Sequence, residues 1–67
     1  MKVAIFPGSF NPITLGHLDL IERGSKLFGK LLVAVVEGDC SVEERVHKVK
    51  QATSGIKNVE VIRFKAD

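Results

Sequence analysis

Apolar residues along the chain gather into three short runs. The runs are Lys2–Phe6 (KVAIF), Leu31–Val36 (LLVAVV) and Val59–Phe64 (VEVIRF). The first two are apolar at nearly every position rather than at alternate ones, which is typical of strands buried on both faces of a parallel sheet. The third run is more polar. We therefore expect three strands, the first two of them covered on both sides.

The stretch between the first two runs predicts a helix. Thr14 is suited to be its N-cap, and Gly29 is a natural stop. Apolar and small residues recur at spacings of three and four along it. We expect Leu18, Ile21, Ser25 and Phe28 to form the inner face, with Leu20, Gly24 and Leu27 broadening it.

A second helix is predicted between the last two runs. Ser41 and Glu44 have the spacing of a capping box, with serine at the N-cap and glutamate three residues later. Gly55 ends the pattern. The inner stripe is expected to hold Val42, Val46, Val49 and Thr53, with Arg45, Lys48 and Lys50 pointing outward and His47 solvated.

The order of elements is β-α-β-α-β, so the fold class is α/β. Two right-handed crossovers in the same direction put both helices on one face of a three-stranded parallel sheet, in the order 3-2-1. This is half of a Rossmann-like, doubly wound fold. Residues 1–67 show no linker or repeat, and we expect a single half-domain.

Size and composition narrow the functional classes. On folding, a 67-residue domain buries only about 60% of the surface that its unfolded chain exposes, so it is marginally stable alone. Cys40 is the sole cysteine, so an internal disulfide is excluded, and two histidines with one cysteine make no convincing zinc site. A net charge of +2, without tryptophan or tyrosine, argues against a nucleic-acid surface. The apolar runs are too short to span a membrane, and one unpaired cysteine suits the cytoplasm.

The turn between the first strand and the first helix carries the candidate chemistry. Ligands of open α/β sheets bind at the carboxyl ends of strands, and a helix N-terminus offers free N–H groups to a phosphate. Gly8 would let the backbone approach such a ligand, and Gly16 would allow close approach at the first helical turn. His17 would sit at the third helical position, with its ring near the phosphate.

Simpler interpretations exist for each residue alone. Prolines and glycines are common in turns, Thr14 could be only an N-cap, and His17 could be an exposed helix residue. The stretch is also neither G-x-G-x-x-G nor G-x-x-x-x-G-K-[ST]. Taken together, these residues predict a phosphate-binding turn without a general nucleotide fingerprint.

Residues 7–17, P-G-S-F-N-P-I-T-L-G-H, resemble the N-terminal signature of bacterial phosphopantetheine adenylyltransferases, P-G-[ST]-F-D-P-[IV]-T-x-G-H. Asn11 stands where that family usually has aspartate. Residues 41–46 (SVEERV) resemble its S-x-E-E-R-V segment, and residues 58–61 (NVEV) its third strand. G-S-F-N-P-I is also similar to nicotinamide mononucleotide adenylyltransferases, but S-x-E-E-R-V favours the phosphopantetheine branch.

The resemblance implies transfer of an adenylyl group from ATP to 4′-phosphopantetheine, giving dephospho-coenzyme A and pyrophosphate. It implies that Ser9 and Phe10 contact ATP, and that Ser9 also touches the acceptor. Gly8, Thr14 and Gly16 would complete the nucleotide-binding turn. His17 would bind the phosphates and stabilise the transition state, and Mg²⁺ would accompany the triphosphate.

Two departures from the family change the expected activity. The segment Glu37–Cys40 is shorter than the family's loop and lacks its acceptor-binding lysine, and the chain is less than half the family's length. We therefore expect a truncated or engineered half that binds ATP or phosphate weakly and does not catalyse transfer alone. The alternatives are an adenylyltransferase active when a missing half is supplied, or a fragment like a nicotinamide mononucleotide adenylyltransferase.

The half-fold also predicts self-association. One sheet face would lack helices, and the first strand would be an open edge. Either the set with Val3 and Ile5 or the set with Ala4 and Phe6 must lie on that face. A two-fold homodimer, or a higher homo-oligomer, would cover the uncovered face by stacking or would join the two edge strands.

Overall fold

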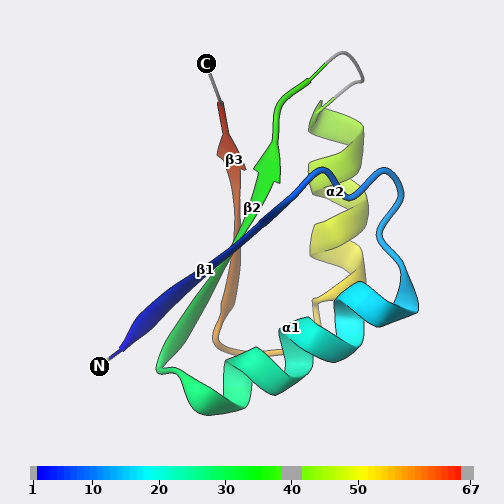
Figure 1. Cartoon of the computed structure of the whole chain (residues 1–67). Helices are drawn as coiled ribbons and strands as arrows, with labels where there is room; N and C mark the ends of the chain where they lie inside the picture. The colour runs from blue at the N-terminus through cyan, green and yellow to red at the C-terminus, as the bar shows by residue number, and fades with distance from the viewer. Residues whose placement is uncertain (1, 39–41, 66–67) are drawn as a thin grey trace.

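The computed structural model of the chain describes residues 2–38 and 42–65. Its elements are β1 (Val3–Gly8), α1 (Leu15–Leu27), β2 (Lys30–Val36), α2 (Val42–Ala52) and β3 (Val59–Phe64), as Figure 1 shows. The β-α-β-α-β order expected from the hydrophobic pattern is confirmed. The expected N-cap Ser41 and the cysteine Cys40 lie outside the described residues.

The three strands form one parallel sheet with β2 in the centre, in the order β1-β2-β3, which is the expected 3-2-1 arrangement. In the register, Ala4 of β1 lies opposite Leu31 of β2, and Leu31 lies opposite Val59 of β3. Each connection returns the chain to the same end of the sheet through a helix, as parallel pairing requires.

β1 continues two residues beyond its expected end at Phe6, through Pro7 and Gly8. The expectation failed because proline usually interrupts a strand. The carbonyl of Lys2 accepts the N–H of Lys30, so even-numbered residues of β1 direct their peptide groups toward β2. Pro7 is odd-numbered and faces the open edge, where its missing N–H removes no ladder hydrogen bond.

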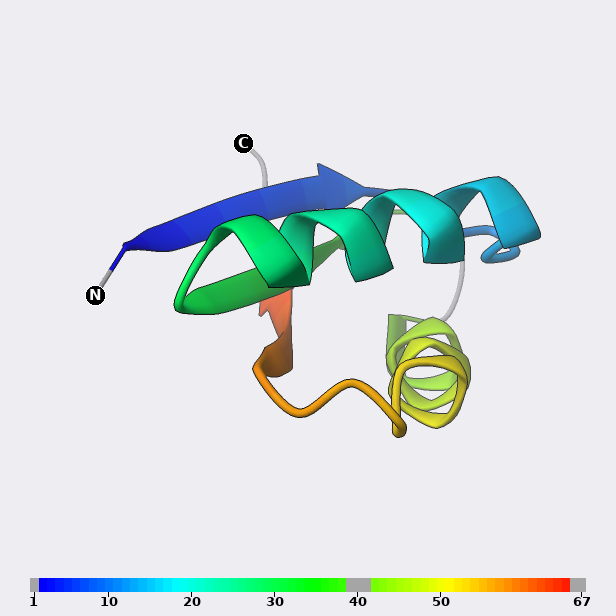
Figure 2. The same ribbon diagram turned by 90° about the horizontal axis from the view of Figure 1, so that it is seen from below.

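Both helices lie on the same side of the sheet, as Figure 1 and Figure 2 show from two directions. Alternate residues of β2, namely Leu31, Val33 and Val35, face the helices and are buried. Ala4 and Phe6 of β1 pack against the same core. The buried core consists of Phe10, Ile21, Leu31, Val33, Val35, Val42 and Val49.

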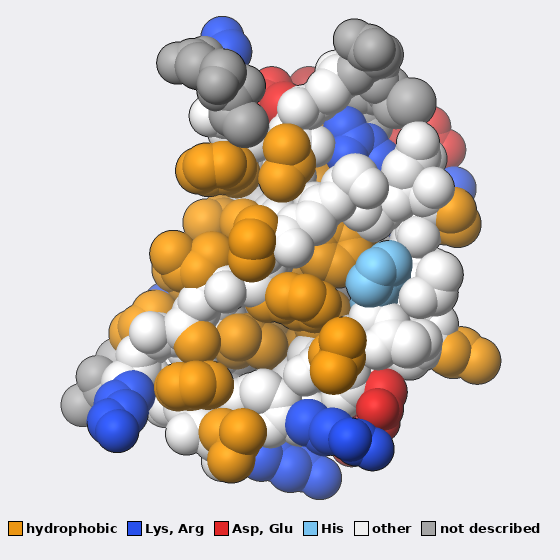
Figure 3. All heavy atoms as spheres, viewed as in Figure 1, with side chains coloured by type: hydrophobic (Ala, Val, Ile, Leu, Met, Phe, Trp, Pro, Cys, Tyr) orange, Lys and Arg blue, Asp and Glu red, His pale blue; other side chains and the backbone are white. Residues whose placement is uncertain are grey.

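The opposite side of the sheet carries no helix among the described residues. Val3 is 51% exposed and Ile5 is 62% exposed, so β1 is not buried on both faces as its composition suggested. We call this surface the uncovered face. Its apolar residues are Val3, Ile5, Leu32, Val36, Ile62 and Phe64, together with Ala34, which lies on this side of β2 but is only 1% exposed. Figure 3 shows hydrophobic side chains gathered over the strand region of the molecule.

α1 begins at the expected place but has a narrower inner face than expected. Ile21 and Ser25 are buried, whereas Leu20 and Leu27 are 57% and 76% exposed. The expectation for these two leucines was wrong because each lies about 100–120° around the helix from Ile21. Gly24 does belong to the inner face, since a methyl group there would lie 3.4 Å from the Leu31 side chain.

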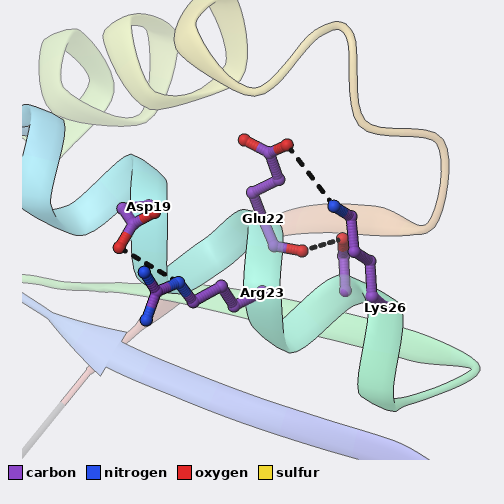
Figure 4. A network of polar contacts seen from close by, with 5 residues as sticks. Asp19, Glu22, Arg23 and Lys26 are labelled. Carbon is purple, nitrogen blue, oxygen red and sulfur yellow. Dashed lines mark hydrogen bonds and ion pairs between the residues drawn. The ribbon is translucent and has the colours of Figure 1, made fainter.

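The outer face of α1 is lined by charged residues one helical turn apart. Arg23 pairs with Asp19 at 3.3 Å, and Lys26 pairs with Glu22 at 3.8 Å, as Figure 4 shows. All four side chains are more than half exposed. Such pairs add only about 0.3–0.5 kcal/mol each. They mark the solvent side of the helix rather than a site.

α2 has most of its expected inner stripe. Val42, Val49 and Thr53 are buried, and Val46 packs partly against the core. His47 is exposed, as expected. Arg45 was expected to point outward, and this was wrong: its side chain is only 7% exposed. None of the helices described here is long and apolar enough to cross a membrane.

Candidate functional site

The candidate site is the turn that links the carboxyl end of β1 to the start of α1. Six residues of this segment were predicted to bind nucleotide: Gly8, Ser9, Phe10, Thr14, Gly16 and His17. They all lie between the last residue of β1 and the first turn of α1. The turn is therefore at the strand ends where open α/β sheets bind ligands.

A capping box formed by Thr14 and His17 starts α1. The backbone N–H of His17 donates to the Thr14 hydroxyl at 3.3 Å, and the N–H of Thr14 donates to Nδ1 of His17 at 3.0 Å. The imidazole thus fills the role that a glutamate or glutamine side chain usually has. A His17 that serves only as an exposed helix residue would not make this contact.

The Thr14 contact also selects the tautomer of His17. Because Nδ1 accepts a hydrogen bond, the proton of the neutral ring is on Nε2. Nε2 has no partner within residues 2–38 and 42–65. The helix cap therefore leaves one N–H donor of His17 available to a ligand.

Phe10 anchors the middle of the turn. Phe10 as a whole residue is only 2% exposed, and its ring packs edge-on against Phe6, with centroids 5.8 Å apart, and against the His17 ring at 5.0 Å. Its φ of 48° is in the left-handed region, which is uncommon for residues other than glycine. The ring is part of the core and is therefore not available to a ligand.

The two glycines of the turn differ in what surrounds them. A Cβ at Gly8 would lie 3.1 Å from the Phe10 ring, so the space beside Gly8 is already filled by that ring. A Cβ at Gly16 would meet only the Thr14 hydroxyl at 3.7 Å, an ordinary contact. Gly8 therefore permits packing of the turn, and only Gly16 leaves space next to the helix start.

Arg45 is the residue of this region that sequence reasoning missed. One guanidinium nitrogen, Nη1, donates to the Ser9 carbonyl at 2.7 Å and to the Val36 carbonyl at 2.8 Å. The signal was present in the spacing, since Val42, Arg45 and Val49 recur at intervals of three and four. The charge of Arg45 nevertheless led us to expect an exposed side chain, because arginine is seldom buried without partners.

Other regions offer less chemistry. A hollow of about 420 Å³ lies between the end of α2 and β3, and Lys50, Thr53 and Lys57 are among its lining residues. It is near the start of β3, at the opposite end of the strands from the turn. Among the described residues, no group of three histidine, cysteine or acidic side chains could hold a metal ion.

The arrangement presents hydrogen-bond donors at a helix N-terminus and no acidic side chain in the first turn of α1. It is suited to an anion such as a phosphate. Transfer of a phosphoryl-type group requires positioned donors more than a covalent nucleophile, and the turn supplies such donors.

Comparison with known proteins identifies the family of the chain. The cytidylyltransferase-like family profile matches residues 5–66. The chain is 58% identical to a phosphopantetheine adenylyltransferase of Clostridium botulinum (strain Alaska E43 / Type E3), over 96% of this chain and 43% of that protein. It is 60% identical to the enzyme of the same name from Limosilactobacillus reuteri (strain DSM 20016), over 92% of this chain and 39% of that protein.

The chain thus spans about two fifths of the length of the curated relatives that it matches. The alignment with the Clostridium botulinum protein covers 69 positions, more than the 67 residues of this chain, so that relative has residues here without a counterpart. The family match extends from β1 through β3 and includes the turn with His17. On this match, the chain belongs to the cytidylyltransferase-like family and resembles phosphopantetheine adenylyltransferases over nearly all of its residues.

Proposed function

We propose that the turn after β1 binds the phosphates of ATP, as part of an adenylyltransferase site. The observation that carries this proposal is the capping box, in which Thr14 holds Nδ1 of His17 and leaves the Nε2 donor free. A phosphate oxygen is a strong acceptor for such a donor. The Phe10 N–H, which also has no hydrogen-bond partner within the described part of the chain, is a second donor in the same turn.

The reaction proposed for the complete site is transfer of the adenylyl group of ATP to 4′-phosphopantetheine, with release of pyrophosphate, a step of coenzyme A biosynthesis. The relatives' name supports this reaction, since they are called phosphopantetheine adenylyltransferases. His17 would stabilise the charge that develops on the phosphates. Ser9, which is exposed directly after β1, would contact the acceptor. The cytoplasm is the compartment that fits the single cysteine.

Mg²⁺ is proposed to arrive with ATP rather than on the protein. The described residues provide no cluster of carboxylates or imidazoles for a metal ion. Phosphate oxygens are ligands that Mg²⁺ prefers, and they would hold it next to the turn. The protein's own part is then to bind and orient the phosphates through backbone N–H groups and His17.

The 67 residues alone are proposed to bind ATP weakly and not to catalyse transfer. They contain the phosphate-binding turn, but the segment Glu37–Cys40 has no lysine for an acceptor phosphate. They also match only about two fifths of each relative. Binding through one turn gives few contacts, so we expect a dissociation constant on the order of 1 mM.

His17→Glu tests the binding site without removing the helix cap. Glutamate is a normal capping-box residue, so Thr14 keeps a partner, while the free donor is replaced by a negative charge. Titration with Mg·ATP, followed by NMR, should shift the amides of Ser9, Phe10 and His17 in the native protein. In His17→Glu these shifts should disappear, with the thermal unfolding temperature little changed.

His47→Glu is the matched control, because it makes the same substitution at an exposed site on α2. It should bind ATP nearly as the native protein does. Shifts confined to β3, or equal shifts in His17→Glu, would contradict the proposed site. Formation of dephospho-coenzyme A by the native chain above a His17→Ala control would contradict the proposed lack of catalysis.

Assembly into a homodimer through the uncovered face is part of the same proposal. That face is roughly 20 Å long and 14 Å wide from strand rise and spacing, which is near the lower end of the size of the largest apolar patches on typical monomers. Lys30 and Glu60 form an ion pair at its margin, at 3.1 Å. The second copy is the occupant that offers an equal apolar surface through a two-fold axis.

Stacking of faces is favoured over pairing of the two β1 edges. Pro7 faces the open edge of β1 and has no N–H to donate there. The remaining donors at that edge belong to Val3 and Ile5, which is too short a ladder to hold two copies together.

A further inference from the structure

The role of Arg45 goes beyond holding α2 against the sheet. Its guanidinium contacts the carbonyl of Val36, the last residue of β2, and the carbonyl of Ser9, the first residue after β1. These two carbonyls come from adjacent strand ends. Arg45 is thus a buried connection between α2 and the candidate site, across 36 residues of sequence.

The contact with Ser9 determines where the next peptide N–H points. The Ser9 carbonyl and the Phe10 N–H belong to one planar peptide unit. This unit is trans, and in a trans unit the two groups point in opposite directions. Because Nη1 draws the carbonyl toward the buried side, the Phe10 N–H is directed away from Arg45.

Two further features hold the same peptide. The φ of Phe10 is 48°, a conformation that a free chain seldom adopts for this residue. Its ring is buried against Phe6 and His17, so the Cα cannot turn to release the strain. The Ser9 carbonyl and the Phe10 ring are therefore both held in place. The Phe10 N–H, which lies between them in the chain, has no hydrogen-bond partner in the described part of the chain.

We infer that Arg45 is a positioning residue for phosphate binding: it holds the Ser9–Phe10 peptide so that the Phe10 N–H faces the ligand. The inference rests on the proposed function of the turn. Arg45 contacts the Ser9 carbonyl on the buried side of the peptide. The phosphate would bind to the Phe10 N–H on the opposite side. It therefore raises affinity without contacting the ligand.

A purely structural role would give a different result. If Arg45 only attached α2 to β2, its loss would lower the free energy of unfolding and leave the affinity of the folded protein unchanged. If only its positive charge attracted the ligand, lysine would replace it fully. Orientation of the peptide predicts instead that affinity depends on the guanidinium itself, which holds the Ser9 and Val36 carbonyls together in a fixed geometry.

The test compares Arg45→Ala and Arg45→Lys with Lys50→Ala, which removes one positive charge from an exposed position of the same helix. The probes are Mg·ATP and inorganic pyrophosphate, and the readouts are the NMR shift of the Phe10 amide and the dissociation constant. Loss of one oriented donor to a charged ligand should weaken binding about tenfold in Arg45→Ala. Lys50→Ala should change it less than about twofold, since an exposed charge is screened.

Chemical rescue of Arg45→Ala distinguishes a loss of orientation of the Ser9–Phe10 peptide from a general loss of structure. Methylguanidinium at low millimolar concentration should enter the space left in Arg45→Ala and restore the Phe10 shift and most of the affinity. Arg45→Lys keeps the charge but lacks the guanidinium's fixed fork, so its affinity should stay below that of the native protein. Arg45→Lys decides the question if Arg45→Ala does not fold.

The outcomes separate this inference from the proposed function. Folded Arg45→Lys or Arg45→Ala that binds like the native protein would overturn the positioning role, while ATP binding at the turn would stand. A native protein whose Ser9, Phe10 and His17 amides do not respond to either probe would overturn the proposed function itself.

Discussion

Gly8 and Gly16 lie on either side of the turn, and the structure gives them different reasons for lacking a side chain. Gly8 leaves room for the Phe10 ring, and Gly16 has open space around it except for Thr14. Both were expected from the sequence to admit a ligand. At the residue scale, only the neighbours of a glycine distinguish packing from ligand approach.

Gly8→Ala and Gly16→Ala should therefore have opposite effects on stability. A methyl group at Gly8 would push on the Phe10 ring at 3.1 Å and should lower the free energy of unfolding by about 1–3 kcal/mol. At Gly16, alanine favours the helix and should be neutral or stabilising by up to about 1 kcal/mol. Urea denaturation measures both. Equal losses in the two variants would contradict this account of Gly8.

If Gly16 admits the phosphate, Gly16→Ala should still weaken Mg·ATP binding although the fold is intact. An unchanged dissociation constant would leave Gly16 with no part in the site.

At the scale of elements, the end of α1 depends on a side chain from the residue directly before β3. Asn58 Nδ2 donates to the carbonyl of Ser25 at 2.6 Å and to that of Phe28 at 3.0 Å. These carbonyls have no partner within the helix, as at any helix end. Asn58 therefore joins α1 to the sheet at the end opposite the candidate site.

Asn58→Asp should lower the free energy of unfolding by about 1–3 kcal/mol, because a carboxylate would face carbonyl oxygens with no proton to donate. Gln51→Glu is the control, since it makes the same chemical change at an exposed position of α2. Chemical denaturation should show little change for the control. A loss of similar size in Gln51→Glu would mean that charge, and not the Asn58 contacts, is responsible.

At the scale of the whole molecule, the sheet has one face packed by both helices and one uncovered face. Val3 is on the uncovered face, and its neighbour Ala4 packs against the core. Adjacent residues of this strand thus lie on opposite faces of the sheet. This separation allows folding and assembly to be perturbed independently.

Val3→Asp should dissociate the proposed homodimer and keep the monomer folded, whereas Ala4→Asp should unfold the chain by placing a charge in the core. Leu15→Asp is the control, because Leu15 is 83% exposed on α1 and not on the uncovered face. Sedimentation at micromolar concentration should give at least twice the 7.3 kDa chain mass for the native protein and Leu15→Asp. A folded native monomer would exclude the dimer.

Local patterns in the sequence were enough to predict the order of the elements and Thr14 as the N-cap of the first helix. Strand β3 agrees residue for residue, whereas the capping contact of the His17 ring was not predicted. The crossover rule then sufficed for the strand order. Each of these features depends on residues close together in the sequence or on a general rule of connection. The amino-acid sequence alone is therefore sufficient to predict them.

Only the tertiary structure decided features that join distant segments. Arg45 meets Ser9 across 36 residues, and Asn58 meets Ser25 across 33. The same holds for Pro7, which stays in β1 because it faces the open edge, and for Ile5, which is exposed because no helix covers its side. Burial of a charged or polar side chain depends on which carbonyls the fold brings within reach, and hydrophobic periodicity does not record those partners.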